Sequence, residues 1–535
     1  MAGPEPEPGQ RSPREPGRLA RLRAAALADD TLSKKASLNA LASMLDYTAR
    51  VIVGLLLNPL LVSRLGDYVF GVYQVLGRLV GYATPAGGRP SQALKWKIAH
   101  IQHSTEYDDK RRQVGSALVV WLLFLPLLVL AGGVLAWFAP DLLDAPESLT
   151  WTIRAAAGVL VLDLVLVNLL TIPQSVVQGE NLGYKRMGLS ALVVFAGGGL
   201  TALLVVLGAG LVGVTAAVVA TTVITGGLFL WVARAHVAWF GTERPPLRAV
   251  WAFVSLSGWF LLWNLVIQLM RGSDVVVLGI VGSAELVTTY ALSRYVPEAI
   301  FGVVAMVVSA IMPGLGGLVG SRDFERARRV RGESMLLTWL IATSAGAAFL
   351  LWAESFLTLW VGERYYPGAV PVLLIVLLTM QFAFIRNDAS IIDVTLELRA
   401  KVVLGLVSSI LSIVLAVVLL RSWETSITAL VAGFVAGRLL LTLSYPWLVG
   451  RYFEMRGMGQ LRGAVRPAVG SAVLFAACVA AAPAVRVDAW LELILLGTVS
   501  FALLLAAALA LGLSGDQRRR LARRARQVLD REREA

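Results

Sequence analysis

The chain is a succession of long apolar runs separated by short polar segments. Most of these runs approach the roughly 20 residues that a helix needs to span a bilayer. Apolar and polar positions do not alternate with a period of two, so the pattern excludes a transmembrane β-barrel. We therefore expect an all-α integral membrane protein with about 14 transmembrane helices, at 41–62, 69–94, 115–138, 153–178, 189–207, 211–232, 252–281, 289–316, 333–353, 369–386, 402–420, 426–448, 467–485 and 490–513.

Composition supports this prediction. Of the 535 residues, 57% are hydrophobic and 16% are charged, against roughly 45–50% and 25% in soluble proteins. A water-soluble fold would have too little polar surface to cover so much apolar surface. The single cysteine, Cys478, excludes an intrachain disulfide, and the three histidines are too scattered to form a metal site. Soluble enzymes, secreted disulfide scaffolds and disordered proteins are excluded.

The net charge of +13 is unevenly distributed along the chain. Most Lys and Arg residues fall in the two tails and in alternate loops, whereas the other loops hold only Arg64, Arg364, Arg421 and Arg486. Because positive loops stay in the cytoplasm, we expect a multi-pass protein of the cell (cytoplasmic or inner) membrane with both termini inside. The basic segments then contact anionic membrane lipids. No aromatic-rich basic module accompanies them, so no nucleic-acid partner is expected.

The runs group into two halves. We expect a cytoplasmic tail at 1–40, an N-lobe of six helices at 41–232, a C-lobe of six helices at 252–448, two extra helices at 467–513 and a basic cytoplasmic tail at 514–535. A weak internal repeat supports two pseudo-symmetric lobes, because a Gly-containing turn precedes Tyr73 and Arg78 in one half and Tyr290 and Arg294 in the other. Transporters built from such repeats bind their substrates near the midplane, at the repeat interface.

Motifs of enzymes are missing from the sequence. It contains no GxxxxGK[ST] phosphate loop, no HExxH and no GxSxG. One GxGxxG occurs at Gly208–Gly213, but it lies between two helices with no strand before it, so we interpret it as a tight turn. No large soluble domain is present either. We expect a transporter and not an enzyme, with no cofactor and no metal ligands.

Ionisable residues inside the predicted helices need an explanation, because each is costly in a bilayer and usually faces a cavity or a partner. Spacings of three or four residues place some of them on one helix face, where they can pair. Arg438 and Glu492 lie near predicted helix ends, where long side chains reach the interface. The whole set is Asp46 with Arg50, Arg78, Asp163, Arg271 with Asp274, Arg294 with Glu298, Arg438 and Glu492. All of these except Asp163, Arg438 and Glu492 lie in predicted helices 1, 2, 7 and 8.

The segment Asn58–Tyr73, together with Asp274–Gly279 and Tyr290–Arg294, resembles the two corresponding hairpins of the polysaccharide transport family, the oligosaccharide-lipid flippases. That family shares a superfamily with multidrug and toxin extrusion transporters and the lipid II flippase. The resemblance implies a central cavity lined by helices 1, 2, 7 and 8, and two extra C-terminal helices. It also implies that the chain flips a polyprenyl-pyrophosphate-linked oligosaccharide by alternating access, for surface polysaccharide biosynthesis.

The resemblance and the buried charges together give a candidate site. Arginines make bidentate bonds to phosphate, which suits the pyrophosphate, and tyrosines suit the glycan. The expected substrate-binding residues are Arg50, Arg78, Arg271, Arg294, Arg89, Tyr73 and Tyr290, and the expected ion-coupling residues are Asp46, Asp274 and Asp163. We expect a monomer that works with glycosyltransferases and a polysaccharide polymerase. A drug or metabolite exporter of the same fold is the alternative.

The end of helix 2 departs from the family pattern. Two prolines and two glycines, at Pro85, Gly87, Gly88 and Pro90, should break or kink that helix. Two interpretations stay open at this point. The helix either ends early, or it contains a hinge that places Arg89 near the cytoplasmic entrance to the cavity.

Overall fold

The computed structural model describes residues 32–513, apart from 103, 187, 396, 397, 424 and 456. The predicted tails at 1–40 and 514–535 therefore lie outside the described residues, except for 32–40. All regular elements in the described part are helices: α2 (Leu32–Gly81), η1 (Thr84–Gly87), α3 (Pro90–His100), α4 (Tyr107–Leu142), α5 (Glu147–Gly179), η2 (Gly183–Arg186), α6 (Leu189–Val206), α7 (Gly210–His236), α8 (Leu247–Val281), α9 (Ala284–Ser293), α10 (Tyr295–Gly320), α11 (Phe324–Trp360), η3 (Glu363–Tyr365), α12 (Ala369–Thr395), α13 (Leu398–Ser422), α14 (Ile427–Tyr452), α15 (Gly457–Ala481), η4 (Ala482–Ala484) and α16 (Trp490–Gly512).

The helices of this part include 13 that are long and apolar enough to cross a membrane. The first of them, Leu41–Gly81, covers two predicted runs, because α2 consists of two helices that meet at Gly66. Gly66 has φ 78 and ψ 165, a conformation that glycine adopts without strain. We call the two parts α2a (residues 32–65) and α2b (residues 67–81). The predicted all-α membrane fold is confirmed.

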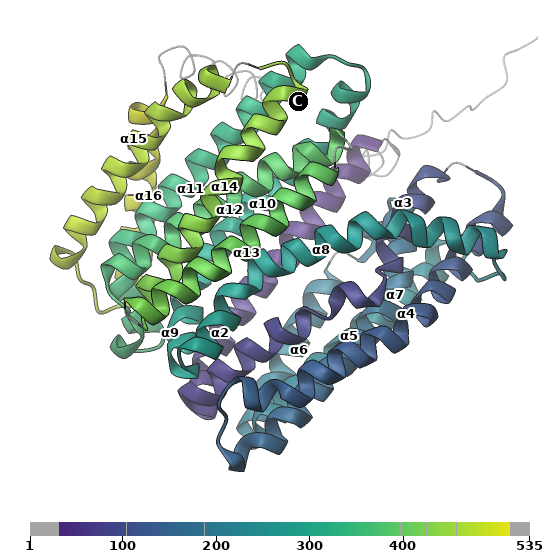
Figure 1. The fold of residues 1–535 in the computed structure, drawn as a ribbon, viewed down its shortest axis with the longest axis horizontal. Coiled ribbons are helices and arrows are strands. Elements are labelled where there is room, and N and C mark those ends of the chain that lie inside the picture. The colour runs from purple at the N-terminus through teal and green to yellow at the C-terminus, as the bar shows by residue number, and fades with distance from the viewer. Residues whose placement is uncertain are drawn as a thin grey trace, which may run out of the picture.

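The helices gather in two bundles, an N-lobe of α2–α7 and a C-lobe of α9–α14, which Figure 1 shows side by side. Helices α15 and α16 pack on the C-lobe against α11. Helix α8 joins the bundles. Its Val250 and Phe253 belong to the core of α3, α4 and α5, whereas its Val266 and Met270 belong to a core of the C-lobe. Helix α8 therefore packs against both lobes. The predicted domain boundaries stay a prediction.

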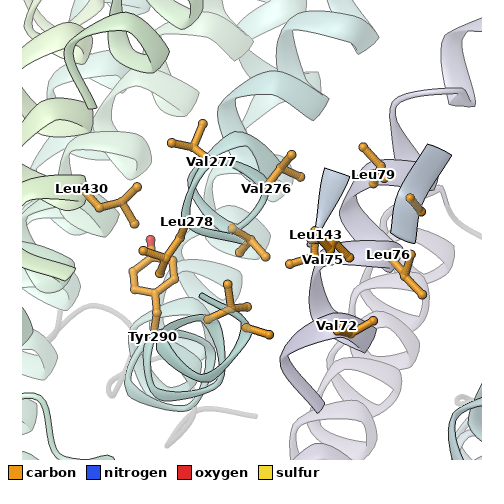
Figure 2. Packing of buried hydrophobic residues seen from close by; sticks show 14 of the residues in the cluster. Val72, Val75, Leu76, Leu79, Leu143, Val276, Val277, Leu278, Tyr290 and Leu430 are labelled. Carbon is orange, nitrogen blue, oxygen red and sulfur yellow. The ribbon is translucent and has the colours of Figure 1, made fainter. Parts of the chain in front are cut away.

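The lobes share a hydrophobic core at one end of the bundle and have separate cores at the other. Leu143, Leu211, Ala284 and Ile427 lie beside the connections that follow α4, α6, α8 and α13, and all four belong to the shared core. Figure 2 shows part of it, with side chains of α2b and α8 together with Leu143. By the predicted topology this end is the outer one. The lobes are therefore packed together at this end, which we call the outer end after the predicted topology.

A reciprocal contact joins α2a to α10. The hydroxyl of Tyr47 donates to the carbonyl of Ala299 at 2.8 Å, and the hydroxyl of Tyr295 donates to the carbonyl of Val51 at 2.6 Å. A Cβ on Gly302 would lie 2.0 Å from the Tyr47 hydroxyl, and one on Gly54 would lie 2.3 Å from the Tyr295 hydroxyl. Each lobe thus packs a tyrosine against a glycine of the other lobe, and a larger residue at either glycine would collide with the tyrosine hydroxyl.

Several predicted helix boundaries were wrong, and three of these differences concern the helices around the site. The helix predicted at 69–94 ends at Gly81, and η1 and α3 follow, because Pro85 removes a backbone donor and the chain leaves the helical region at Gly88 (φ 69) and Arg89 (φ 44). The helix predicted at 369–386 extends to Thr395 as α12. The helix predicted at 289–316 is divided at Arg294, between α9 and α10.

Candidate functional site

Arg294 lies at the centre of a charged cluster in the C-lobe. Its Nη1 donates to Asp274 Oδ2 at 2.8 Å, and its Nη2 donates to Glu298 Oε1 at 2.6 Å. Tyr290 completes the arrangement, because its hydroxyl donates to the same Asp274 oxygen at 2.7 Å. The predicted pair of Arg294 and Glu298 is confirmed. Asp274 is buried at 1% exposure, and its other oxygen, Oδ1, accepts from the backbone N–H of Val275 at 2.9 Å, so both carboxylate oxygens are hydrogen-bonded.

The pair predicted between Arg271 and Asp274 was wrong. Both residues lie on α8, but Asp274 is buried whereas Arg271 is exposed. Asp274 pairs with Arg294 of the neighbouring hairpin instead. A separation of three residues rotates the side chain by about 60° around the helix axis, which is enough to change its surroundings.

Arg78 brings the N-lobe to this cluster. Its Nη2 lies 3.6 Å from Glu298 Oε1, so the two lobes share that carboxylate. Gly272 of α8 allows the approach, because a Cβ there would meet the Arg78 side chain at 3.3 Å. Nearby, Tyr82 donates to Ser273 at 2.9 Å. The contact between α2b and α8 is thus polar around Arg78 and Tyr82.

A pocket adjoins the cluster. Its walls come from α8, α9, α10, α12 and α14: Met270, Arg271, Asp274, Tyr290, Arg294, Glu298, Phe301, Ile375, Leu378, Thr379, Phe382 and Arg438. Arg438 is buried, donates to the Met270 carbonyl and stacks near Phe382 at 5.4 Å. It was interpreted from the sequence as a residue near a helix end, and its role was missed. With Arg78, the site holds four arginines against the carboxylates Asp274 and Glu298, so two positive charges are in excess.

Several predicted site residues lie elsewhere. Asp46 is buried and Arg50 is exposed on α2a. Tyr73 packs in apolar clusters, with its ring 6.5 Å from that of Phe70. Asp163 of α5 lies near the hydroxyl of Thr222 of α7, inside the N-lobe. None of these side chains lines the pocket at Arg294.

The segment around Arg89 enters the N-lobe. A Cβ on Gly88 would lie 2.7 Å from Phe124 of α4, and one on Gly87 would lie 3.0 Å from Asn168 of α5. Arg89 itself has a left-handed backbone and is the N-cap residue of α3. The structure therefore shows an interrupted helix 2, with the break packed between α4 and α5. Arg89 does not line the pocket at Arg294.

Polar contacts also join the lobes at the outer end. Asp67 of α2b accepts hydrogen bonds from Arg364 at 3.1 Å and from Tyr365, and its carbonyl accepts from Thr288 at 2.6 Å. Burial and the bond to Asp67 raise the pKa of Tyr365 to about 12, so its hydroxyl stays a donor at neutral pH. We call Asp67, Arg364 and Tyr365 the outer lock. Within the described residues, no group of three or more His, Cys, Asp and Glu side chains is placed to hold a metal ion.

No family model and no curated protein matches this sequence. Solved structures do match its fold. The chain shares its fold with solved structures of MOP superfamily transporters. A multidrug resistance MATE family transporter matches in its outward-facing conformation (15% identity, TM-score 0.56, 78% of this chain and 95% of that chain). The inward-facing conformation of such a transporter matches as well (15%, 0.56, 81% and 98%). A MOP superfamily transporter from Pyrococcus furiosus matches to a similar degree (16%, 0.56, 79% and 97%).

Proposed function

We propose that the chain is a transporter that exports an anionic, lipid-linked oligosaccharide across the cytoplasmic membrane by alternating access, as part of surface polysaccharide biosynthesis. The observation that carries this proposal is the excess of arginine over carboxylate where the lobes meet, at Arg78, Arg271, Arg294 and Arg438. Uncompensated cations are costly inside a membrane protein and mark substrate or ion pathways. A pyrophosphate would supply the missing negative charge through charge-assisted, bidentate hydrogen bonds.

The distribution of packing supports alternating access. The lobes share a core at the outer end and have separate cores at the inner end, so a substrate would enter from the inside in this conformation. Fold relatives exist in both inward-facing and outward-facing conformations. For the lipid tail we propose passage beside α2a and α10, where the contacts are two tyrosine hydrogen bonds placed over glycines.

We propose that ion coupling uses carboxylates of the N-lobe. Asp274 is already neutralised by Arg294, which makes it a poor ion-coupling residue. Asp163 has one carboxylate oxygen, Oδ1, that is buried and has no hydrogen-bond partner among the described residues. We propose Asp163, with Asp46 on the same lobe, for proton or sodium coupling. The proposed working form is a monomer in the cell membrane with both termini inside, supplied by glycosyltransferases and followed by a polymerase.

A multidrug exporter is the second candidate, since some of the solved fold relatives are multidrug resistance transporters. Cationic drugs, however, favour a carboxylate-rich pocket, and this pocket has the opposite balance. The Pyrococcus furiosus relative is described by a binding pocket of reverse polarity that suggests a different function. Pocket charge therefore separates the two candidates.

The test uses the purified protein in liposomes. We expect it to move a fluorescent polyprenyl-pyrophosphate oligosaccharide between leaflets, and we expect Arg78→Lys to slow the movement because lysine keeps the charge and loses the planar fork. Arg421→Lys, at the exposed outer end of α13, is the matched control. Efflux of a cationic dye without movement of the oligosaccharide lipid would establish the drug exporter instead.

A further inference from the structure

A further arginine continues the pocket wall on α12. Ile375, Thr379 and Phe382 line the pocket and are spaced by four and three residues, so they share one face of the helix. Four residues on, the same face carries Arg386. Arg386 thus stands one turn, about 5–6 Å, further toward the inner end. The predicted helix ended at this residue, so the pattern did not indicate that Arg386 continues this face.

Arg386 has no anionic partner among the described residues. Its Nη1 is buried and makes no hydrogen bond. Two cations lie close enough to interact with it, Arg271 of α8 and Lys401 of α13. Lys401 is satisfied, because it pairs with Asp393 and its ammonium lies 3.5 Å from the centre of the Trp263 ring. Arg386 therefore lacks the compensation that Lys401 has.

Arg271 is also without an ion pair in the described part of the chain. The carboxylate that attracts it, Glu298, is already bound to Arg294 at 2.6 Å and to Arg78 at 3.6 Å. Arg271 in the pocket wall and Arg386 one turn beyond it thus bring like charges from two helices to the inner side of the pocket. A buried donor without a partner costs free energy, and so does a like-charge pair, unless a ligand supplies the negative charge.

We propose that Arg271 and Arg386 form an anion subsite that binds the pyrophosphate of the transported lipid on the inner side of the pocket. This inference rests on the proposed function and deepens it. Two guanidinium forks match the several oxygens of a pyrophosphate. The subsite would bind the headgroup first, and the cluster at Arg294 would be reached one to two turns further out along α8 and α12.

The test measures binding of inorganic pyrophosphate to the full chain in nanodiscs of zwitterionic lipid, by calorimetry. We expect Arg386→Gln and Arg271→Gln each to weaken binding about tenfold or more, and Arg386→Lys to be intermediate. Arg399→Gln is the matched control, because Arg399 is an exposed arginine near the same end of the C-lobe. It should bind like the wild type.

The melting temperature of the unliganded protein distinguishes a purely structural role of Arg386 from the proposed role in anion binding. We expect the melting temperature of Arg386→Gln to equal or exceed that of the wild type, because the change removes an uncompensated charge. Wild-type affinity in Arg386→Gln would overturn the subsite, and so would an affinity loss matched by a fall in melting temperature. A short-chain prenyl diphosphate should compete with pyrophosphate. Equal competition by phosphatidylglycerol would overturn the assignment to the transported lipid.

The liposome assay separates this inference from the proposed function. If the wild type moves no oligosaccharide lipid while pyrophosphate binding depends on Arg386, the transport function fails and the anion subsite stands. If the wild type moves the lipid and Arg386→Gln moves it and binds pyrophosphate normally, the subsite fails and the transport function stands.

Discussion

At the scale of single residues, Asp274 holds the positive charges of the C-lobe in place. It is buried and accepts hydrogen bonds from both Arg294 and Tyr290. Removing one member of a buried ion pair leaves the other charged, desolvated and unpaired, which costs more than the pair itself contributes. Asp274 is therefore proposed to act through its neighbours, by fixing where their guanidinium and hydroxyl groups point.

We predict that Asp274→Asn destabilises the protein by about 3–5 kcal/mol. Asparagine keeps the size of the side chain and loses the charge that neutralises Arg294. The measurement is the thermal midpoint in detergent together with the amount of protein in the membrane. Asp141→Asn is the control, because Asp141 is 66% exposed and its ion pair with Arg154 is 3.8 Å long. A variant of Asp274 as stable as the wild type would show that Arg294 does not depend on this carboxylate.

The sequence predicted only part of this residue-scale arrangement. The spacing of Arg294 and Glu298 revealed their pair, because four residues on one helix place two side chains on the same face. The pairing of Asp274 with Arg294 joins two helices and left no mark in local spacing. Arg438 was missed because it was interpreted as a residue near a helix end, and Arg386 was missed because the predicted helix ended at that residue.

At the scale of elements, the length of the apolar runs predicted the helices well, because a bilayer requires each backbone group to bond within its own segment. The prolines and glycines after Gly81 correctly predicted a break in helix 2. They did not reveal where the broken segment would pack, which is set by Phe124 and Asn168 on other helices. The break is therefore a built feature of the N-lobe, and the hinge remains a hypothesis about its movement.

We predict that Gly88→Ala destabilises the N-lobe by about 1–3 kcal/mol, because Gly88 has φ 69 and its new Cβ would meet Phe124. Gly77→Ala is the matched control on the preceding helix, where a Cβ meets nothing within 4 Å. It should leave stability unchanged or raise it by up to about 1 kcal/mol. Thermal unfolding of the two variants checks this. If both behave alike, the close packing of the break has no energetic weight.

At the scale of the whole molecule, the arrangement of cores suggests how the lobes would move. The outer ends share one core and the outer lock, whereas the inner ends have separate cores joined by α8. Opening to the outside would have to break the contacts of Asp67 with Arg364 and Tyr365. A partly exposed ion pair of this kind contributes only about 0–1 kcal/mol, so a transported substrate can supply enough binding energy to open it.

The last prediction tests this movement by preventing it. In a Cys478→Ala background, Asp67→Cys with Arg364→Cys should be joined by a short bis-maleimide, and the joined protein should not transport. The matched control is Asp141→Cys with Arg154→Cys, an ion pair between two helices of the N-lobe that should be joined equally well without loss of transport. Joining positions within one lobe leaves the lobes free to rock, whereas joining positions across the lobes does not. Normal transport after cross-linking of the lobes would show that the outer ends do not separate during the cycle, and alternating access by rocking lobes would be excluded.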